Sequence, residues 1–137
     1  LTHAPRTKGG AVTKAAAEVG DVLGAKYLVT FTQTGDSARR ISRLRSHIPI
    51  LAITPEVGTY NRLALSWGIE PIVSPMVKHT DDMVLQADKL IIDSKRAVIG
   101  DPVMIIAGAP PGIPGSTNAM RVHTVGDAVN GVVPAYK

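Results

Sequence analysis

The sequence contains no cysteine, so disulfide bonds, thiolate nucleophiles and cysteine metal sites are excluded, and a reducing cytoplasm is the expected location. Aromatic residues make up only 4% of the chain and form no stacking stripe for nucleic acid. No apolar run approaches the ~20 residues of a membrane span, and nothing near the start resembles a signal peptide. We therefore expect a soluble protein that binds neither membrane nor nucleic acid.

What is present suits one globular domain of 137 residues, with 45% hydrophobic and 19% charged residues. The net charge is +4, and basic residues cluster at Arg39-Arg40, Arg43 and Arg45. Such a local cluster favours a small anionic ligand or an acidic partner surface over a nucleic-acid duplex. The chain begins with Leu1 rather than Met, so we expect a processed, truncated or excised piece of a longer polypeptide.

The chain divides by composition into three parts. Residues 1–10 are polar and basic and are predicted to be a linker or the end of a preceding element, 11–126 form the domain, and 127–137 are a tail. From Val12 the apolar residues recur at helical spacing, which predicts a helix, and Gly24 is placed to end it. The stripe predicted to face the core consists of Val12, Ala15, Ala16, Val19, Val22 and Leu23. Buried strands are predicted at 27–31, 50–53, 72–73 and 103–107. Three helices are predicted between them. The first carries Ala38, Ile41 and Leu44, the second spans about 59–67, and the third begins at an N-cap at Thr80.

This alternation predicts an α/β three-layer sandwich with a mostly parallel five-stranded sheet. Residues 107–119 are too rich in Gly and Pro for a crossover helix, so the strand at 119–125 is predicted to be an antiparallel edge strand. Its alternation places Met120 and Val122 on one face and Arg121 and His123 on the solvent face. An edge exposes unpaired backbone groups, which makes this strand a candidate for subunit pairing.

Two segments follow predicted strands, where ligands of parallel sheets bind. Thr32, Thr34, Ser37 and Gly35 gather between a strand and a helix start, which suits a phosphate. The same residues also suit a plain turn whose hydroxyls serve the backbone, and residue type alone favours the turn. The second segment is the loop at 108–117. The sequence contains no P-loop, G-x-G-x-x-G, nucleophile-elbow or metal-spacing motif, so we expect no catalytic residues in this chain.

These segments resemble the C-terminal domain of the pyruvate kinase family. The run from Phe31 to Arg39, FTQTGDSAR, is similar to the family's effector-phosphate loop, and PILAITP from Pro49 to Pro55 is similar to its next strand. WGIEP, GDPV and GSTN follow in the family's order and spacing, and the resemblance runs from about Val12 to Val125.

The resemblance implies a phosphotransferase of glycolysis that is tetrameric and allosterically regulated, with this domain binding a phosphorylated effector. Its catalytic barrel domain would lie in the same chain and hold Mg²⁺ and K⁺, with no cofactor here. The residues that match the effector site are Thr32, Gln33, Thr34, Gly35 and Ser37 for the phosphate, and Gly112 and Gly115 for the loop over the sugar. The alternative is a stand-alone phosphate-binding module of the same fold without kinase activity.

Two residues depart from the family pattern. Gln33 stands where some members have Lys, which removes a charge-assisted contact to phosphate. Asp36 adds a negative charge where many members have Arg or a neutral residue. We therefore expect a sugar monophosphate in preference to a bisphosphate.

Overall fold

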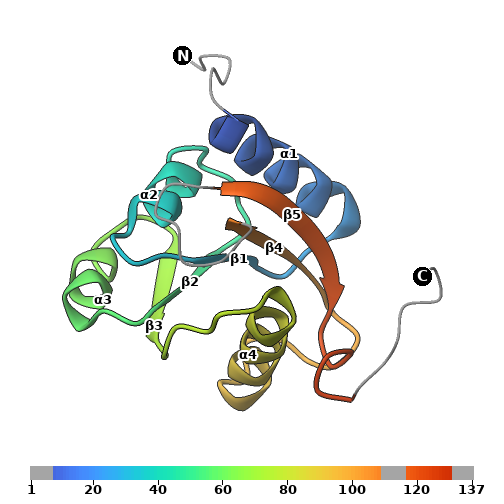
Figure 1. Cartoon of the computed structure of the whole chain (residues 1–137). Helices are drawn as coiled ribbons and strands as arrows, with labels where there is room; N and C mark the ends of the chain where they lie inside the picture. Colours follow the sequence, from blue (N-terminus) through green and yellow to red (C-terminus); the bar gives the residue numbers. More distant parts are fainter. Residues whose placement is uncertain (1–7, 109–116, 131–137) are drawn as a thin grey trace.

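The structure is a computed structural model that describes residues 8–108 and 117–130 (Figure 1). The described residues form four helices and five strands. In chain order these are α1 (Lys8–Leu23), β1 (Leu28–Phe31), α2 (Asp36–Ser42), β2 (Ile50–Thr54), α3 (Val57–Leu63), β3 (Ile69–Val73), α4 (Thr80–Asp93), β4 (Pro102–Gly108) and β5 (Thr117–Thr124). The α/β alternation predicted from the sequence is therefore confirmed up to β4.

The strands form one sheet in the order β3-β2-β1-β4-β5. β1 pairs in parallel with both β2 and β4, with Leu28 opposite Ile50 on one side and Met104 on the other. β5 runs antiparallel to β4, with Pro102 opposite Thr124. This confirms the predicted mostly parallel sheet with an antiparallel edge strand.

Helices cover both faces of the sheet, so the predicted three-layer sandwich is also confirmed (Figure 1). On one face, Leu28 and Met104 pack against Ala16 of α1, Ile41 of α2 and Leu63 of α3. On the other face, alternate strand residues pack against α4; they form a cluster of Val29, Leu51, Val103 and Ile105 with Val84, Ala87 and Ile91. The alternation follows from the two-residue period of a strand.

The stripe predicted for α1 is only partly correct: Ala16 is buried and Val12 and Val19 are half-buried against the core, but Val22 is 85% exposed and Leu23 is also exposed. The buried residues of the helix are Gly9, Thr13, Ala16 and Gly20. The helix packs close to the sheet: a Cβ added at Gly20 would lie 3.1 Å from Met104 Cγ. Small residues therefore face the core, and size rather than hydrophobicity decides the buried side. The helix also begins at Lys8, inside the segment predicted to be a linker or the end of a preceding element.

Other boundaries shift by a few residues. α3 runs from Val57 to Leu63 rather than from 59 to 67, and β3 begins at Ile69 rather than Ile72. The N-cap of α4 is His79 rather than Thr80, and Leu44 lies beyond α2 and is exposed. These shifts leave the topology unchanged.

The predicted solvent position of His123 is also wrong. His123 on β5 is only 4% exposed, and its Nε2 lies 3.0 Å from Oδ1 of the fully buried Asp88 on α4. Met120 and Val122, predicted to face inward, are each about half exposed. The alternation is real, but α4 covers the His123 face and supplies a carboxylate to the ring.

The Asp88 carboxylate also binds the chain that follows β5. Oδ1 accepts a hydrogen bond from Gly126 N at 2.8 Å, and Oδ2 accepts from Ala128 N at 3.1 Å and Val129 N at 3.0 Å. The described part of the predicted tail, residues 127–130, is therefore attached to the domain through Ala128 and Val129.

Candidate functional site

The loop from Thr32 to Gly35 lies at the carboxyl end of β1, where the sequence predicted a ligand site. The chain leaves β1 toward β2 on one side, whereas β4 flanks β1 on the other side. The reversal of strand order beside β1 is the place where open α/β sheets bind ligands. The loop after β4, with the predicted Gly112 and Gly115, lies outside the described residues.

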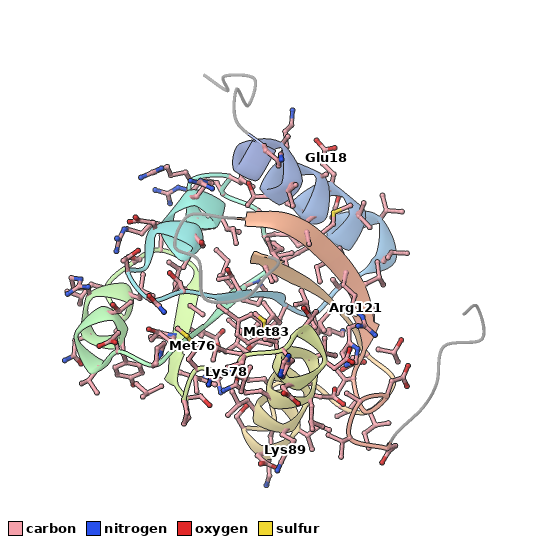
Figure 2. All side chains as sticks on the ribbon, viewed as in Figure 1. Glu18, Met76, Lys78, Met83, Lys89 and Arg121 are labelled. Carbon is pink, nitrogen blue, oxygen red and sulfur yellow. The ribbon has the colours of Figure 1, made fainter. Side chains whose placement is uncertain are left out.

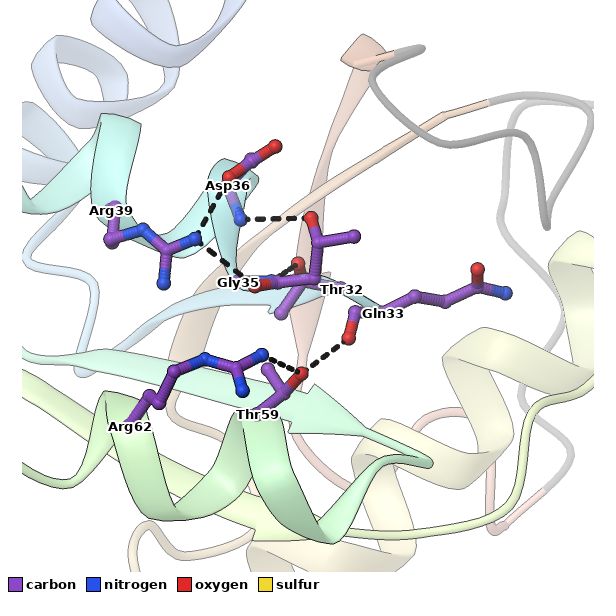
Figure 3. A network of polar contacts seen from close by, with 8 residues as sticks. Thr32, Gln33, Gly35, Asp36, Arg39, Thr59 and Arg62 are labelled. Atoms are coloured by element: carbon purple, nitrogen blue, oxygen red, sulfur yellow. Dashed lines mark hydrogen bonds and ion pairs between the residues drawn. The ribbon is translucent and has the colours of Figure 1, made fainter.

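The loop's first hydroxyls serve its own backbone. Thr32 N donates to Ile53 O of β2 at 2.9 Å, and the buried Thr32 Oγ1 accepts from Gly35 N at 2.8 Å. Thr34 Oγ1 accepts from Asp36 N at 3.3 Å. These bonds are those of the plain turn, so the hydroxyl oxygens of Thr32 and Thr34 fix the loop's shape (Figure 3). Ser37 lies in the first turn of α2 and is half-buried.

Gly35 is needed at its position for two reasons. Its φ of 93° is in the left-handed region that residues with a Cβ rarely adopt. A Cβ there would also lie 2.7 Å from Arg39 Nη1 and 3.1 Å from Leu63 Cδ2. The Arg39 guanidinium therefore folds back over the loop, in the space that the glycine leaves.

Arg39 is held at the loop by two acceptors. Its Nη2 lies 2.8 Å from Asp36 Oδ1 and donates to Thr34 O at 3.1 Å (Figure 3). The Arg39 guanidinium, followed by a hydrogen bond from the Thr34 side chain, holds the pKa of Asp36 below its ordinary value. Asp36 is therefore an anion at neutral pH, and it neutralises the cation nearest to the candidate site.

A second cation, Arg62 of α3, is linked to the loop through Thr59. Thr59 Oγ1 donates to Gln33 O at 2.6 Å, and Arg62 Nη2 donates to Thr59 Oγ1 at 3.1 Å (Figure 3). Neither Thr59 nor Arg62 was predicted as a site residue. The signal that could have found them is topological, because the parallel pairing of β1 and β2 brings the chain after β2 to the same edge of the sheet.

Gln33 points away from these cations. Its Nε2 lies 3.3 Å from Met76 Sδ, in the segment between β3 and α4. That segment is joined to α4 by Gln86, whose Nε2 donates to Ser74 Oγ at 2.7 Å and to Pro75 O at 2.6 Å. Figure 2 shows Met76 near the end of β3 and Lys78 between β3 and α4. The loop after β1 therefore contacts the chain that leads into α4.

The loop after β1 therefore has two guanidinium groups beside it, with Arg39 bonded to Thr34 O and Arg62 bonded to Thr59. Within residues 8–108 and 117–130, no group of three His, Asp or Glu side chains is placed to hold a metal ion. Across the same ranges, none of the helices has the length and apolar character required to cross a bilayer.

Comparison with known proteins identifies the family. A family profile described as "Pyruvate kinase, alpha/beta domain" matches residues 10–123. The chain is 46% identical over 127 residues to the pyruvate kinase of Mycobacterium tuberculosis and 42% identical over 127 residues to that of Corynebacterium glutamicum. Each alignment covers 93% of this chain and 27% of the relative, so the chain spans about a quarter of the length of these curated relatives.

A solved structure carries the same fold. The crystal structure of a pyruvate kinase from Cryptosporidium parvum matches with a TM-score of 0.79 at 23% identity, covering 90% of this chain and 24% of that one. The family profile spans the loop after β1 and all five strands except the end of β5. This chain belongs to the pyruvate kinase α/β domain family.

Proposed function

We propose that this chain is the regulatory C-terminal domain of a pyruvate kinase, the cytoplasmic enzyme of glycolysis that converts phosphoenolpyruvate and ADP to pyruvate and ATP. The support is the family membership, together with relatives named pyruvate kinase that are more than three times as long. The catalytic barrel domain of the same polypeptide would hold the substrates, Mg²⁺ and K⁺. This domain would contribute regulation and subunit contacts.

The regulatory ligand would be a phosphorylated effector, of the sugar-monophosphate type, bound at the loop after β1. Thr32, Gln33, Thr34, Gly35 and Ser37 would form its phosphate site, and Gly112 and Gly115 would close over the sugar. The observation that carries this proposal is the position of the loop at the carboxyl end of β1 beside two guanidinium groups. Arg39 from α2 donates to Thr34 O, and Arg62 from α3 donates to Thr59, which in turn donates to Gln33 O. Guanidinium groups beside exposed backbone are the usual partners of phosphate oxygens.

Hydroxyl deletion tests the phosphate site. We expect the double substitution Thr34→Ala with Ser37→Ala to weaken the binding of a hexose monophosphate at least tenfold, measured by titration calorimetry. The matched control is Thr80→Ala with Ser94→Ala on and beyond α4, which removes the same two hydroxyl types outside the loop. Equal affinity in wild type and in the loop double mutant would remove the phosphate assignment.

The domain would also form one interface of a homotetramer, through the edge strand β5. This proposal is supported by the position of β5 as one of the two edge strands of the sheet and by Met120 and Val122, which are about half exposed on it. The effector would act by population shift, favouring one loop and helix arrangement and so one relation between subunits. Because charged side chains oppose edge pairing, we expect Val122→Lys to reduce the sedimentation coefficient from that of a tetramer. A tetramer that survives this change would place the interface elsewhere.

A further inference from the structure

Asp36 occupies the groups that a phosphate at this loop would need. Its Oδ1 lies 2.8 Å from Arg39 Nη2, and its carboxylate shares a side-chain hydrogen bond with Thr34. Arg39 is the cation that is hydrogen-bonded to the loop, and Thr34 is a proposed phosphate ligand. We propose that Asp36 is an internal competitor for the effector phosphate, which binds only by displacing the Asp36 carboxylate from Arg39; this inference rests on the proposed function.

The ion pair is placed so that exchange is possible. The side chain of Asp36 is 71% exposed and that of Arg39 is 36% exposed. Exposed ion pairs of this kind contribute little to stability, so a ligand of higher charge can replace one partner. Arg39 would remain in place when the carboxylate leaves, because Nη2 also donates to Thr34 O at 3.1 Å and the guanidinium lies over Gly35.

The competition selects for a dianion. Asp36 stays ionised near neutral pH, so a proton does not release Arg39 there and a ligand must do so. A phosphate monoester carries close to two negative charges at pH 7 and offers several oxygens to a planar guanidinium. A simple carboxylate offers one charge, no more than Asp36 itself. Asp36 would therefore set the specificity of the loop for phosphate monoesters over carboxylic acids.

Neutralising Asp36 tests the competition in the complete natural polypeptide. Inorganic phosphate is the probe, and its apparent dissociation constant is taken from the rise of the thermal midpoint with phosphate at pH 7.5 and constant ionic strength. We expect Asp36→Asn to tighten phosphate binding about five- to tenfold, because one close negative charge is removed and Arg39 is released. The matched control, Glu18→Gln on α1, removes the same charge from a residue paired with Lys14, and should leave the constant within a factor of two.

A double-mutant cycle separates displacement from simple repulsion. If Asp36 acts by masking Arg39, the gain from Asp36→Asn should fall below about twofold in an Arg39→Gln background, where there is no guanidinium to release. A gain of equal size in both backgrounds would overturn the displacement. A dissociation constant for phosphate that Asp36→Asn leaves unchanged or raises relative to wild type would also overturn it. Either result would leave the phosphate site itself intact. Absence of a phosphate response in wild type and in Asp36→Asn would instead refute the proposed site and this inference together.

Discussion

The buried carboxylate of Asp88 offers the sharpest test of what holds this domain together. Its two oxygens accept four hydrogen bonds, from His123, Gly126, Ala128 and Val129. Because an ionised carboxylate has no proton to donate, Nε2 of His123 must carry the hydrogen in the 3.0 Å contact. One side chain of α4 therefore joins β5 and the turn after it to the helix layer.

The substitution Asp88→Asn keeps the shape of the side chain but replaces one acceptor oxygen with a donor. The amide should turn its oxygen toward the buried pair, Gly126 and His123, and its NH₂ toward the part-buried N–H groups of Ala128 and Val129. Two backbone donors then lose an acceptor at about 1–3 kcal/mol each, near the low end because water can reach them. We expect the free energy of unfolding to fall by about 2–4 kcal/mol.

Urea denaturation followed by far-UV circular dichroism measures this loss. With a denaturant slope of about 2 kcal/mol/M, the midpoint should fall by about 1–2 M urea. Asp93→Asn, at the exposed end of the same helix, is the matched control and should change the stability by less than about 0.5 kcal/mol. If Asp88→Asn costs no more than this control, the four bonds to Asp88 do not stabilise the fold as argued.

The pH dependence of this loss has a definite sign. Burial acts to raise the pKa of Asp88, but hydrogen bonds from the backbone N–H groups of Gly126 and Val129 and from His123 outweigh it and lower the pKa. A lowered folded-state pKa contributes stability above the unfolded value of about 3.9, and this contribution disappears as pH falls through the folded value. The deficit of Asp88→Asn at pH 7 should therefore shrink below about pH 4, and a deficit that grows in acid would contradict this assignment.

Three further substitutions test the loop after β1 and the contact between α1 and the sheet. Gly35→Ala should cost about 1–3 kcal/mol and displace Arg39, because φ is 93° and the new Cβ would meet Nη1 at 2.7 Å; denaturation checks the first effect and weaker phosphate binding the second. Thr59→Val should cost about 1–2 kcal/mol, since it removes the 2.6 Å bond to Gln33 O, whereas Thr59→Ser should retain most of the stability. Gly20→Val should cost about 1–3 kcal/mol against the closely packed Met104 and Ile48, while Ala11→Val on the exposed side of α1 should cost less than about 1 kcal/mol in the same denaturation assay.

The topology could be predicted from the sequence because local patterns determine it. Buried runs such as Ile50–Thr54 separate the helices, and the Gly- and Pro-rich segment after β4 leaves no room for a crossover. Those two facts yield a parallel sheet with one antiparallel edge. The position of Thr32–Gly35 at a strand end follows from the same pattern, since a loop between β1 and α2 must lie at the carboxyl edge.

The features that were predicted wrongly or missed from the sequence depend on contacts between distant segments. Val22 fits a helical stripe as well as Gly20 does, and only the approach of α1 to Met104 makes the small residue the buried one. Asp88 was not found from the sequence, because its four partners lie 35 to 41 positions further along the chain. No local period records such partners, and the same holds for Thr59, which reaches Gln33 across 26 positions.

The hydroxyls of the loop do not all carry the same information about binding. Thr32 is buried and its oxygen accepts the N–H of Gly35, so a change there alters the shape of the turn before it removes a ligand contact. Thr34 is exposed and already bonds to both the backbone and the side chain of Asp36. Loss of binding in Thr32→Val would therefore report on loop structure, whereas substitutions at Thr34, Asp36 and Arg39 report on the exchange of one anion for another.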